Sequence, residues 1–215
     1  MALTRFESER EEMISLLEER GIKDPNLLRA MRKVDRHLFV TDIFINRSYE
    51  DSALPIGCSQ TISQPYTVAF MTEALEVQPG NKILEIGTGS GYQAALLSEM
   101  GARVFTIERH MTLLEEARHR FDSLGYTIAS KAGDGTIGWK EFAPFDGIIV
   151  TAGAPSVPPS LQTQLKEGGL LVIPIGDLDI QHLNIIRRRG EMYETKKVEG
   201  FKFVPLIGKG AWGKE

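Results

Sequence analysis

The stretch Ile83-Leu-Glu-Ile-Gly-Thr-Gly-Ser-Gly91 decides the fold of this chain, because an apolar run passes directly into three alternating glycines. It predicts a strand that ends at a nucleotide-shaped ligand. Glycine has no Cβ, so the loop can turn sharply with positive φ and bring its backbone N–H groups close to a ligand. Residues 92–100 then have the pattern of a helix, and Gly101 stands where a left-handed cap is favoured.

The spacing of the glycines differs from the dinucleotide fingerprint G-x-G-x-x-G, because the third glycine arrives one residue early. Glu85 stands two residues before the first glycine, and an acid beside the loop suits an amine or a hydroxyl better than a pyrophosphate. The loop alone is a weak signal. A tight turn in an ordinary α/β domain stays open as an alternative.

Two further acids follow at predicted strand ends. Glu108 closes the apolar run 103–107, about 20 residues beyond the first glycine, where an acid can accept hydrogen bonds from a ribose diol. Asp134, in Ala132-Gly-Asp-Gly135, is placed to accept a hydrogen bond from an exocyclic amine. Viewed in isolation, Asp134 fits a plain Asp-Gly turn equally well.

The order of elements indicates one α/β domain. Two helices are expected near residues 6–17 and 25–34, an irregular covering loop over 39–63, and a helix from Pro65. Strands and helices then alternate, which predicts a doubly wound, mainly parallel sheet with helices on both faces. The later elements are expected as strands at 126–131, 145–150, 169–175, 183–188 and 202–207 and a helix at 158–167.

The glycine loop, Glu108 and Gly133-Asp-Gly135 together resemble S-adenosylmethionine-dependent methyltransferases of the Rossmann-like class. A closer resemblance, over nearly the whole chain, is to the protein-L-isoaspartate O-methyltransferase family. Four more segments carry it: Arg36-His-Leu-Phe-Val40, Gln60-Thr-Ile-Ser-Gln-Pro-Tyr66, Phe145-Asp-Gly-Ile-Ile-Val-Thr-Ala-Gly-Ala-Pro155 and Phe203-Val-Pro-Leu-Ile-Gly208. The chain departs from the family at Cys58-Ser59, where glycine or another small or acidic residue is more usual.

The resemblance implies a single domain, residues 1–215, in which a helical cap and substrate loop (1–64) precede a Rossmann-like core that binds the cofactor (65–215). The implied reaction is methyl transfer from S-adenosylmethionine to the free carboxylate of L-isoaspartyl residues in damaged peptides and proteins, which starts their repair through a succinimide. The alternative is a methyltransferase for another small-molecule or nucleic-acid acceptor.

The resemblance also implies roles for residues. Ser63 is the catalytic residue that orients the acceptor carboxylate, with Thr61 beside it. Sequence alone favours a different role for Ser63, as the cap of the helix that starts at Pro65, and the resemblance reverses that preference. The implied cofactor contacts are Gln60, Thr61, Glu85, Gly87, Thr88, Gly89, Ser90, Glu108, Arg109, Asp134 and Gly135. Val204 and Leu206 are expected to contact the substrate, although an ordinary terminal strand is an alternative for their segment.

Composition and residue spacing argue against several other classes of function. The net charge of −4 argues against a nucleic-acid surface, and the four histidines share no metal-ligand spacing, so no metal site is expected. The glycine spacing argues against a nicotinamide oxidoreductase. The single cysteine, Cys58, is expected to be buried or half-buried and inert.

No run of the sequence approaches the ~20 apolar residues of a membrane span. The first 20 residues carry charges throughout, where a secretory signal would need an apolar stretch. A cytoplasmic enzyme without membrane partners is therefore expected. The sequence does not fix the oligomeric state, and a monomer is compatible with it.

Overall fold

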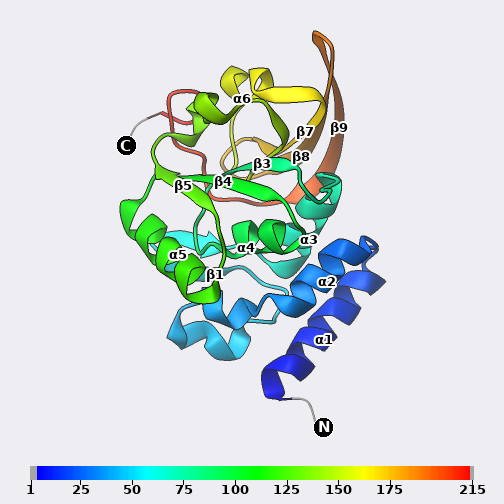
Figure 1. Cartoon of the computed structure of the whole chain (residues 1–215), viewed down its shortest axis with the longest axis vertical. Coiled ribbons are helices and arrows are strands. Elements are labelled where there is room, and N and C mark those ends of the chain that lie inside the picture. Colours follow the sequence, from blue (N-terminus) through cyan, green and yellow to red (C-terminus); the bar gives the residue numbers. More distant parts are fainter. Residues whose placement is uncertain (1–3, 214–215) are drawn as a thin grey trace.

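A computed structural model describes residues 4–213. Its centre is a seven-stranded sheet with the strand order β5-β4-β3-β6-β7-β8-β9 (Figure 1). The strands of this sheet are β3 (Lys82–Ile86), β4 (Arg103–Glu108), β5 (Ala129–Ala132), β6 (Phe145–Val150), β7 (Leu165–Gly176), β8 (Gln181–Arg189) and β9 (Met192–Phe201). The first five are parallel neighbours, and β8 and β9 continue the sheet as an antiparallel meander.

The helices and a small hairpin surround this sheet. The helices are α1 (Arg5–Glu19), α2 (Pro25–Lys33), α3 (Pro65–Ala74), α4 (Tyr92–Glu99), α5 (Met111–Leu124) and α6 (Pro159–Thr163), with shorter 3-10 turns at η1 (Arg36–Phe39), η2 (Asp42–Arg47), η3 (Gly135–Ile137) and η4 (Lys140–Phe142). The hairpin consists of β1 (Leu54–Gly57) and β2 (Gln60–Ile62). The predicted doubly wound α/β fold is confirmed.

The sheet separates two hydrophobic cores, because successive side chains of a strand point to opposite faces. On β3, Ile83 belongs to the core beneath α1 to α5, whereas Leu84 belongs to the core on the side of α6. Ile149 and Ile148 on β6 divide in the same way. Figure 1 shows the larger helices gathered on one face and α6 on the other. This burial on both faces explains the nearly continuous apolar runs of the parallel strands.

The covering loop expected over residues 39–63 has more structure than the sequence indicated. It contains η2 and the β1–β2 hairpin, whose two-residue turn is Cys58-Ser59. Both residues have positive φ, 49° and 56°, as a type I′ turn requires. The expectation of a buried or half-buried Cys58 was wrong, because the tip of this hairpin exposes the side chain.

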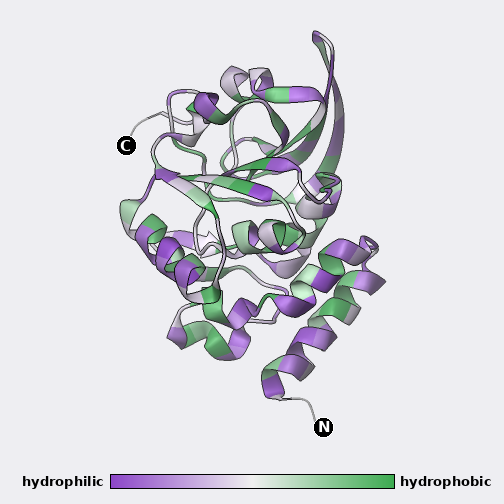
Figure 2. Cartoon of the chain, in the orientation of Figure 1, coloured by the Kyte–Doolittle hydropathy of each residue, from purple (hydrophilic) through white to green (hydrophobic). Residues whose placement is uncertain are grey.

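The end of the chain also differs from the prediction. The strand expected at 202–207 is absent, and the last strand of the described sheet is β9, residues Met192–Phe201. Figure 2 shows that β9 is mostly hydrophilic, as expected for an edge strand exposed to solvent, so it has no strong apolar signature. Residues 203–207 instead run beside the loop after β6, where Gly153 N donates to Val204 O and Leu206 N donates to Gly153 O.

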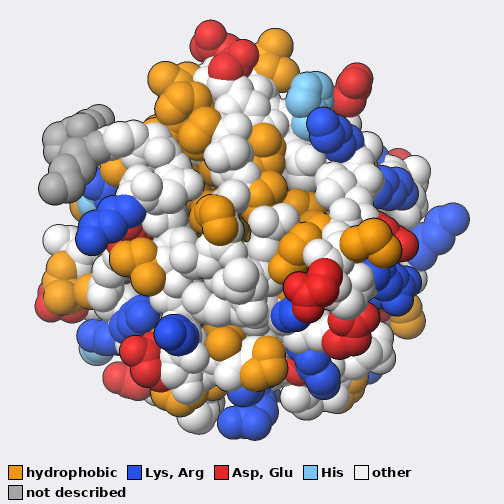
Figure 3. All heavy atoms as spheres, turned by 90° about the horizontal axis from the view of Figure 1, so that it is seen from above, with side chains coloured by type: hydrophobic (Ala, Val, Ile, Leu, Met, Phe, Trp, Pro, Cys, Tyr) orange, Lys and Arg blue, Asp and Glu red, His pale blue; other side chains and the backbone are white. Residues whose placement is uncertain are grey.

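The elements between β4 and β7 shift by a few residues from the predicted ranges. β5 starts at Ala129 rather than near 126, and α6 is only five residues long, because β7 already begins at Leu165. No helix among residues 4–213 is long and apolar enough to cross a membrane. On the face in Figure 3, hydrophobic side chains gather near the centre, while acidic and basic side chains lie interleaved around them.

Candidate functional site

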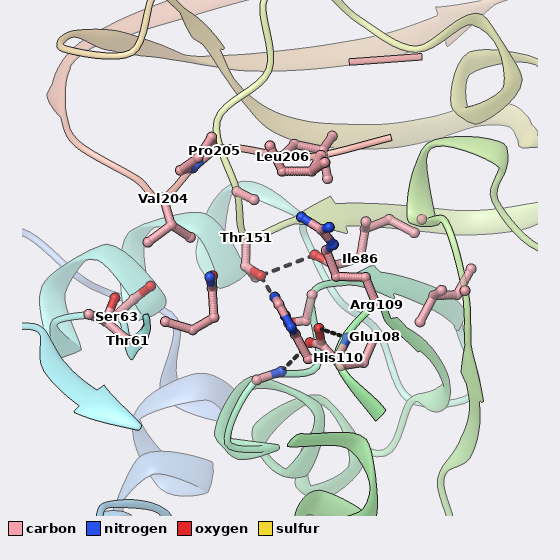
Figure 4. A pocket seen from close by; sticks show the side chains of 18 residues that line it. Thr61, Ser63, Ile86, Glu108, Arg109, His110, Thr151, Val204, Pro205 and Leu206 are labelled. Atoms are coloured by element: carbon pink, nitrogen blue, oxygen red, sulfur yellow. Dashed lines mark hydrogen bonds between the residues drawn. The ribbon is translucent and has the colours of Figure 1, made fainter. Parts of the chain in front are cut away.

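Most of the predicted site residues line a cavity of about 650 Å³ at the carboxyl ends of β3, β4 and β6. The strand order reverses between β3 and β6, so this is the position at which doubly wound sheets bind ligands. Figure 4 shows Glu108 to His110 on one side of Thr151, Thr61 and Ser63 on the other, and residues 204–206 above them.

The glycine loop and Glu108 are joined directly. Gly89 N donates to Oε2 of Glu108 and His110 N donates to Oε1, each over 2.9 Å (Figure 4). The Glu108 side chain is buried at 5% exposure but lies in the cavity wall. Because a carboxylate oxygen has two lone pairs, each oxygen can accept one further hydrogen bond from a ligand in the cavity.

Gly87 shows why the loop needs glycine. Its φ is +97°, and a Cβ added there would lie 2.4 Å from Oγ1 of Thr151. The Thr151 hydroxyl lies 3.0 Å from the Ile86 carbonyl oxygen and 2.9 Å from that of Gly87, to which it can donate. Thr151 therefore packs against the loop backbone at the floor of the cavity, a role that the sequence analysis did not identify.

Glu85 lies beneath the glycine loop rather than in the cavity wall. It is fully buried, and its Oε2 accepts from the Thr106 hydroxyl, which lies 2.6 Å from the hydroxyl of Thr88 in the loop. Burial raises the pKa of Glu85 to about 8, so the carboxyl is mostly protonated near neutral pH. Glu85 therefore supports the loop from beneath, and its expected contact with the cofactor stays a prediction.

Asp134 also lies outside the residues that line the cavity. Its Oδ1 accepts from Thr136 N (2.9 Å) and from the Thr136 hydroxyl (2.6 Å), and its Oδ2 accepts from Lys209 N (2.8 Å). Partial burial opposes ionisation, but these hydrogen bonds outweigh it and lower the pKa of Asp134. Asp134 therefore caps η3 and holds the turn at 208–210, and its expected contact with adenine stays a prediction.

Ser63 does not cap helix α3. The N-cap residue is Gln64, and Oδ1 of Asp51 accepts from Tyr66 N over 2.8 Å. No hydrogen bond occupies the Ser63 hydroxyl within residues 4–213, and its side chain lines the cavity. The alternative that Ser63 serves as a cap is therefore wrong, and the hydroxyl is available to a ligand.

Two smaller cavities adjoin the main one. The second, about 400 Å³, lies between the Ser63 segment and the glycine loop and includes Thr88, Ser90 and Tyr92 in its wall. The third, about 370 Å³, lies between the Ser63 segment and residues 202–204, and Lys202 is the one charged residue that lines it. Thr61, Ser63 and Thr151 line all three cavities.

Most of the predicted site residues thus meet at one place. The main cavity includes Gln60, Thr61, Ser63, Gly87, Gly89, Glu108, Arg109, Gly135, Val204 and Leu206. The sequence analysis missed Thr151, His110, Lys202 and the apolar wall residues Ile86, Ile107 and Ile207. The sequence held a signal for Thr151 and His110, because each stands one or two residues beyond the end of a predicted strand.

Comparison with known proteins is consistent with this geometry. The family model described as Protein-L-isoaspartate(D-aspartate) O-methyltransferase (PCMT) matches residues 8–211. The chain is similar to the protein-L-isoaspartate O-methyltransferases of Chlorobaculum tepidum (54% identical; 95% of this chain and 96% of the relative covered) and Dictyoglomus thermophilum (50% identical; 96% and 94% covered).

Two solved structures share the fold over most of the chain. One, a protein-L-isoaspartate O-methyltransferase, is 29% identical with a TM-score of 0.85, covering 94% of this chain and 67% of that one. The other is a Plasmodium falciparum protein solved in complex with S-adenosyl-L-homocysteine; it is 25% identical with a TM-score of 0.80, covering 92% and 97%.

Proposed function

Because this chain belongs to the protein-L-isoaspartate(D-aspartate) O-methyltransferase family, we propose that its main cavity binds S-adenosylmethionine and that the cavity beside Lys202 admits the acceptor. The chain is an S-adenosylmethionine-dependent enzyme that methylates the free carboxylate of L-isoaspartyl residues in peptides and proteins. The resulting ester can return through a succinimide, so the methyl transfer begins repair of the damaged residue.

The meeting of three cavities at Thr61, Ser63 and Thr151 is the observation that carries this proposal. Two of these cavities are lined by the glycine loop, and the third is lined by Lys202. A donor bound beside the glycine loop and an acceptor bound beside Lys202 would meet at the three shared residues. Such an arrangement suits an in-line displacement, in which the attacking and leaving atoms lie on opposite sides of the transferred carbon.

The residues present fit the cofactor. Glu108 offers the free lone pairs of a held carboxylate to a ribose diol, which is the usual role of an acid at this strand end. The glycines at 87 and 89 leave the loop open for a close approach of the methionine part, with Thr88 and Ser90 at the second cavity. We assign Arg109 and Gly135 to the adenine end, where Ile107 supplies an apolar wall, together with Asp134, which precedes Gly135 in the chain.

When bound, S-adenosylmethionine supplies an electrophilic methyl group: a carboxylate oxygen forms a bond to this carbon as the carbon–sulfur bond breaks, and the sulfonium charge is lost. An isoaspartyl carboxylate is already ionised near neutral pH, so the enzyme needs no general base. Its task is to hold the anion in line and to exclude water. This explains why no nucleophile-and-base pair is needed at the site.

Ser63 and Thr61 are the proposed donors to the acceptor carboxylate. Both line the three cavities, and the Ser63 hydroxyl is not engaged by a neighbouring residue in the described structure. Lys202, which is exposed, would add a positive charge at the mouth of the acceptor cavity. Val204 would form part of the wall of this cavity, and Leu206 would contact the peptide from the adjoining main cavity. A charge at the mouth of a cavity raises the local concentration of an anionic ligand.

We further propose a division of the single domain, in which residues 1–64 form the helical cover and residues 65–215 hold the cofactor. Residues 1–3 and 214–215 of these two parts lie outside the described structure. Gln60 and Thr61, on strand β2 of the cover, reach the main cavity and would close over the bound cofactor.

A single assay tests the proposed function. The purified protein is given S-adenosylmethionine with a methyl label and either an isoaspartyl peptide or its normal aspartyl twin. We expect a base-labile methyl ester on the isoaspartyl peptide only. Equal methylation of both peptides, or label that resists base, would exclude this acceptor chemistry.

A further inference from the structure

Arg36 on η1 is the largest fully buried side chain in the described structure, with 0% exposure. Its Nε donates to the carbonyl oxygen of Ser48 over 2.7 Å, and its Nη2 donates to the carbonyl oxygen of Ser63 over 3.0 Å. Its Nη1 is buried and has no hydrogen-bond partner among residues 4–213. The guanidinium carbon lies 5.0 Å from the centre of the Tyr92 ring.

No carboxylate contacts this buried cation in the described structure. Asp51 acts on it only through its field, because its own carboxylate pairs with Arg20 and caps α3 at Tyr66. Burial lowers the pKa of Arg36, but a guanidinium stays protonated in proteins. A buried charge without an ion-pair partner raises the free energy of the folded state, and an apolar side chain would fill this space with a smaller penalty. Packing alone therefore does not explain an arginine here.

The contacts of Arg36 connect the two halves of the site. Ser63 is the proposed donor to the acceptor, and Tyr92 is the first residue of α4, directly after the glycine loop. Ser63 and Tyr92 both line the second cavity. The planar guanidinium has a rigid geometry, so its contacts fix the direction as well as the distance of the groups it holds.

We propose that Arg36 is a positioning residue for methyl transfer: its guanidinium, held between the Ser48 carbonyl and the Tyr92 ring, fixes the backbone of Ser63 and thereby aims the Ser63 hydroxyl at the acceptor carboxylate. The inference rests on the proposed role of Ser63. Arg36 itself does not line any of the three cavities, so it acts through Ser63 and not on the reacting atoms.

The test uses Arg36→Lys, which keeps the charge and loses the two-point fork. We expect kcat for an isoaspartyl peptide to fall about tenfold, since a small misplacement of a positioned group is enough to slow a reaction by that amount or more. The dissociation constant for S-adenosylmethionine should stay within about twofold, because the cofactor contacts are untouched. Arg36→Met is the second variant, because it fills the same space without burying a flexible ammonium group.

The matched control is Arg10→Lys on α1, whose guanidinium is mostly buried and pairs with Asp35, with no hydrogen bond to the Ser63 segment in the described structure. It should leave kcat within about twofold even if the melting temperature falls, because a purely structural change does not alter the site of the folded enzyme. An equal loss of kcat in Arg10→Lys and Arg36→Lys would overturn the proposal.

A double-mutant cycle separates the proposal from the role of Ser63. If Arg36 acts by aiming the Ser63 hydroxyl, Arg36→Lys should lower kcat by less than about twofold once Ser63→Ala has removed that hydroxyl. A tenfold loss in both backgrounds, or an unchanged kcat in Arg36→Lys and Arg36→Met, would overturn the proposal. If Ser63→Ala alone leaves kcat unchanged, the role of Ser63 fails instead.

Discussion

Gly89 N donates a hydrogen bond to Oε2 of Glu108 over 2.9 Å, which joins the turn after β3 to the end of β4. The glycine loop and the acid are therefore one unit. A change at Glu108 releases the loop as well as removing an acceptor for the ligand. It also frees His110 N, which Oε1 holds at 2.9 Å.

Glu108→Ala should weaken S-adenosylmethionine binding by about 1.5 to 3 kcal/mol, because a charged acceptor for the ribose hydroxyls is lost. Glu108→Gln should lose less, since an amide oxygen still accepts. Titration calorimetry measures both. Glu115→Ala serves as the control, because it removes an exposed carboxylate on α5. Cofactor affinity that is unchanged in Glu108→Ala would remove the ribose assignment.

The parts of this site that the sequence predicted are those that depend on short stretches of chain. The glycine loop and Glu108 follow directly from apolar runs that end in particular residues, and the sheet then brings them together. Contacts between distant segments left no such signature. Thr151 packs on Gly87 across 64 positions, and Asp134 is held by Lys209 across 75.

Local patterns also failed where solvent, rather than a core, surrounds the chain. β9 carries Glu194-Thr-Lys-Lys197 in its middle and buries little, so its strand conformation comes from pairing with β8 and not from an apolar pattern. The Ser63 hydroxyl was ambiguous for a different reason. A serine before a proline-initiated helix commonly caps it, and only the position of Asp51 shows that another residue does so here.

Glu85 should make stability depend on pH. The carboxyl has a pKa near 4.5 when unfolded and about 8 in the fold, so between these values the folded state binds one more proton than the unfolded state. The free energy of unfolding contributed by this group therefore falls as pH rises through that window. Glu85→Gln removes this titratable group, so the free energy of unfolding should depend less on pH. Urea unfolding at several pH values between about 5 and 8 measures this.

Glu199→Gln on the exposed strand β9 is the matched control for that experiment, because it makes the same chemical change in solvent. It should leave the shape of the profile unchanged. Parallel profiles for the parent chain and Glu85→Gln would mean that Glu85 titrates alike in the folded and unfolded states.

Lys202→Gln should raise the KM for an isoaspartyl peptide at low ionic strength by about threefold and leave kcat nearly unchanged, because Lys202 attracts the anion from the mouth of its cavity. Salt should reduce the difference, since exposed charges are screened. Lys196→Gln, on β9 and outside the three cavities, makes the same charge change. Equal KM values for the two variants would show that KM depends on the net charge of the protein and not on the position of Lys202.

Ser63→Ala should lower kcat for an isoaspartyl peptide on the order of 10²-fold, because one positioned donor to the acceptor is lost in a sheltered site. Its effect on stability should be below about 0.5 kcal/mol, since the hydroxyl has no partner within the described structure and Asp51 caps α3. Initial rates, cofactor affinity and melting temperature are measured on one preparation. Full activity with a lowered melting temperature would make Ser63 a structural residue, and the acceptor carboxylate would then have to be held by Thr61 or by the backbone alone.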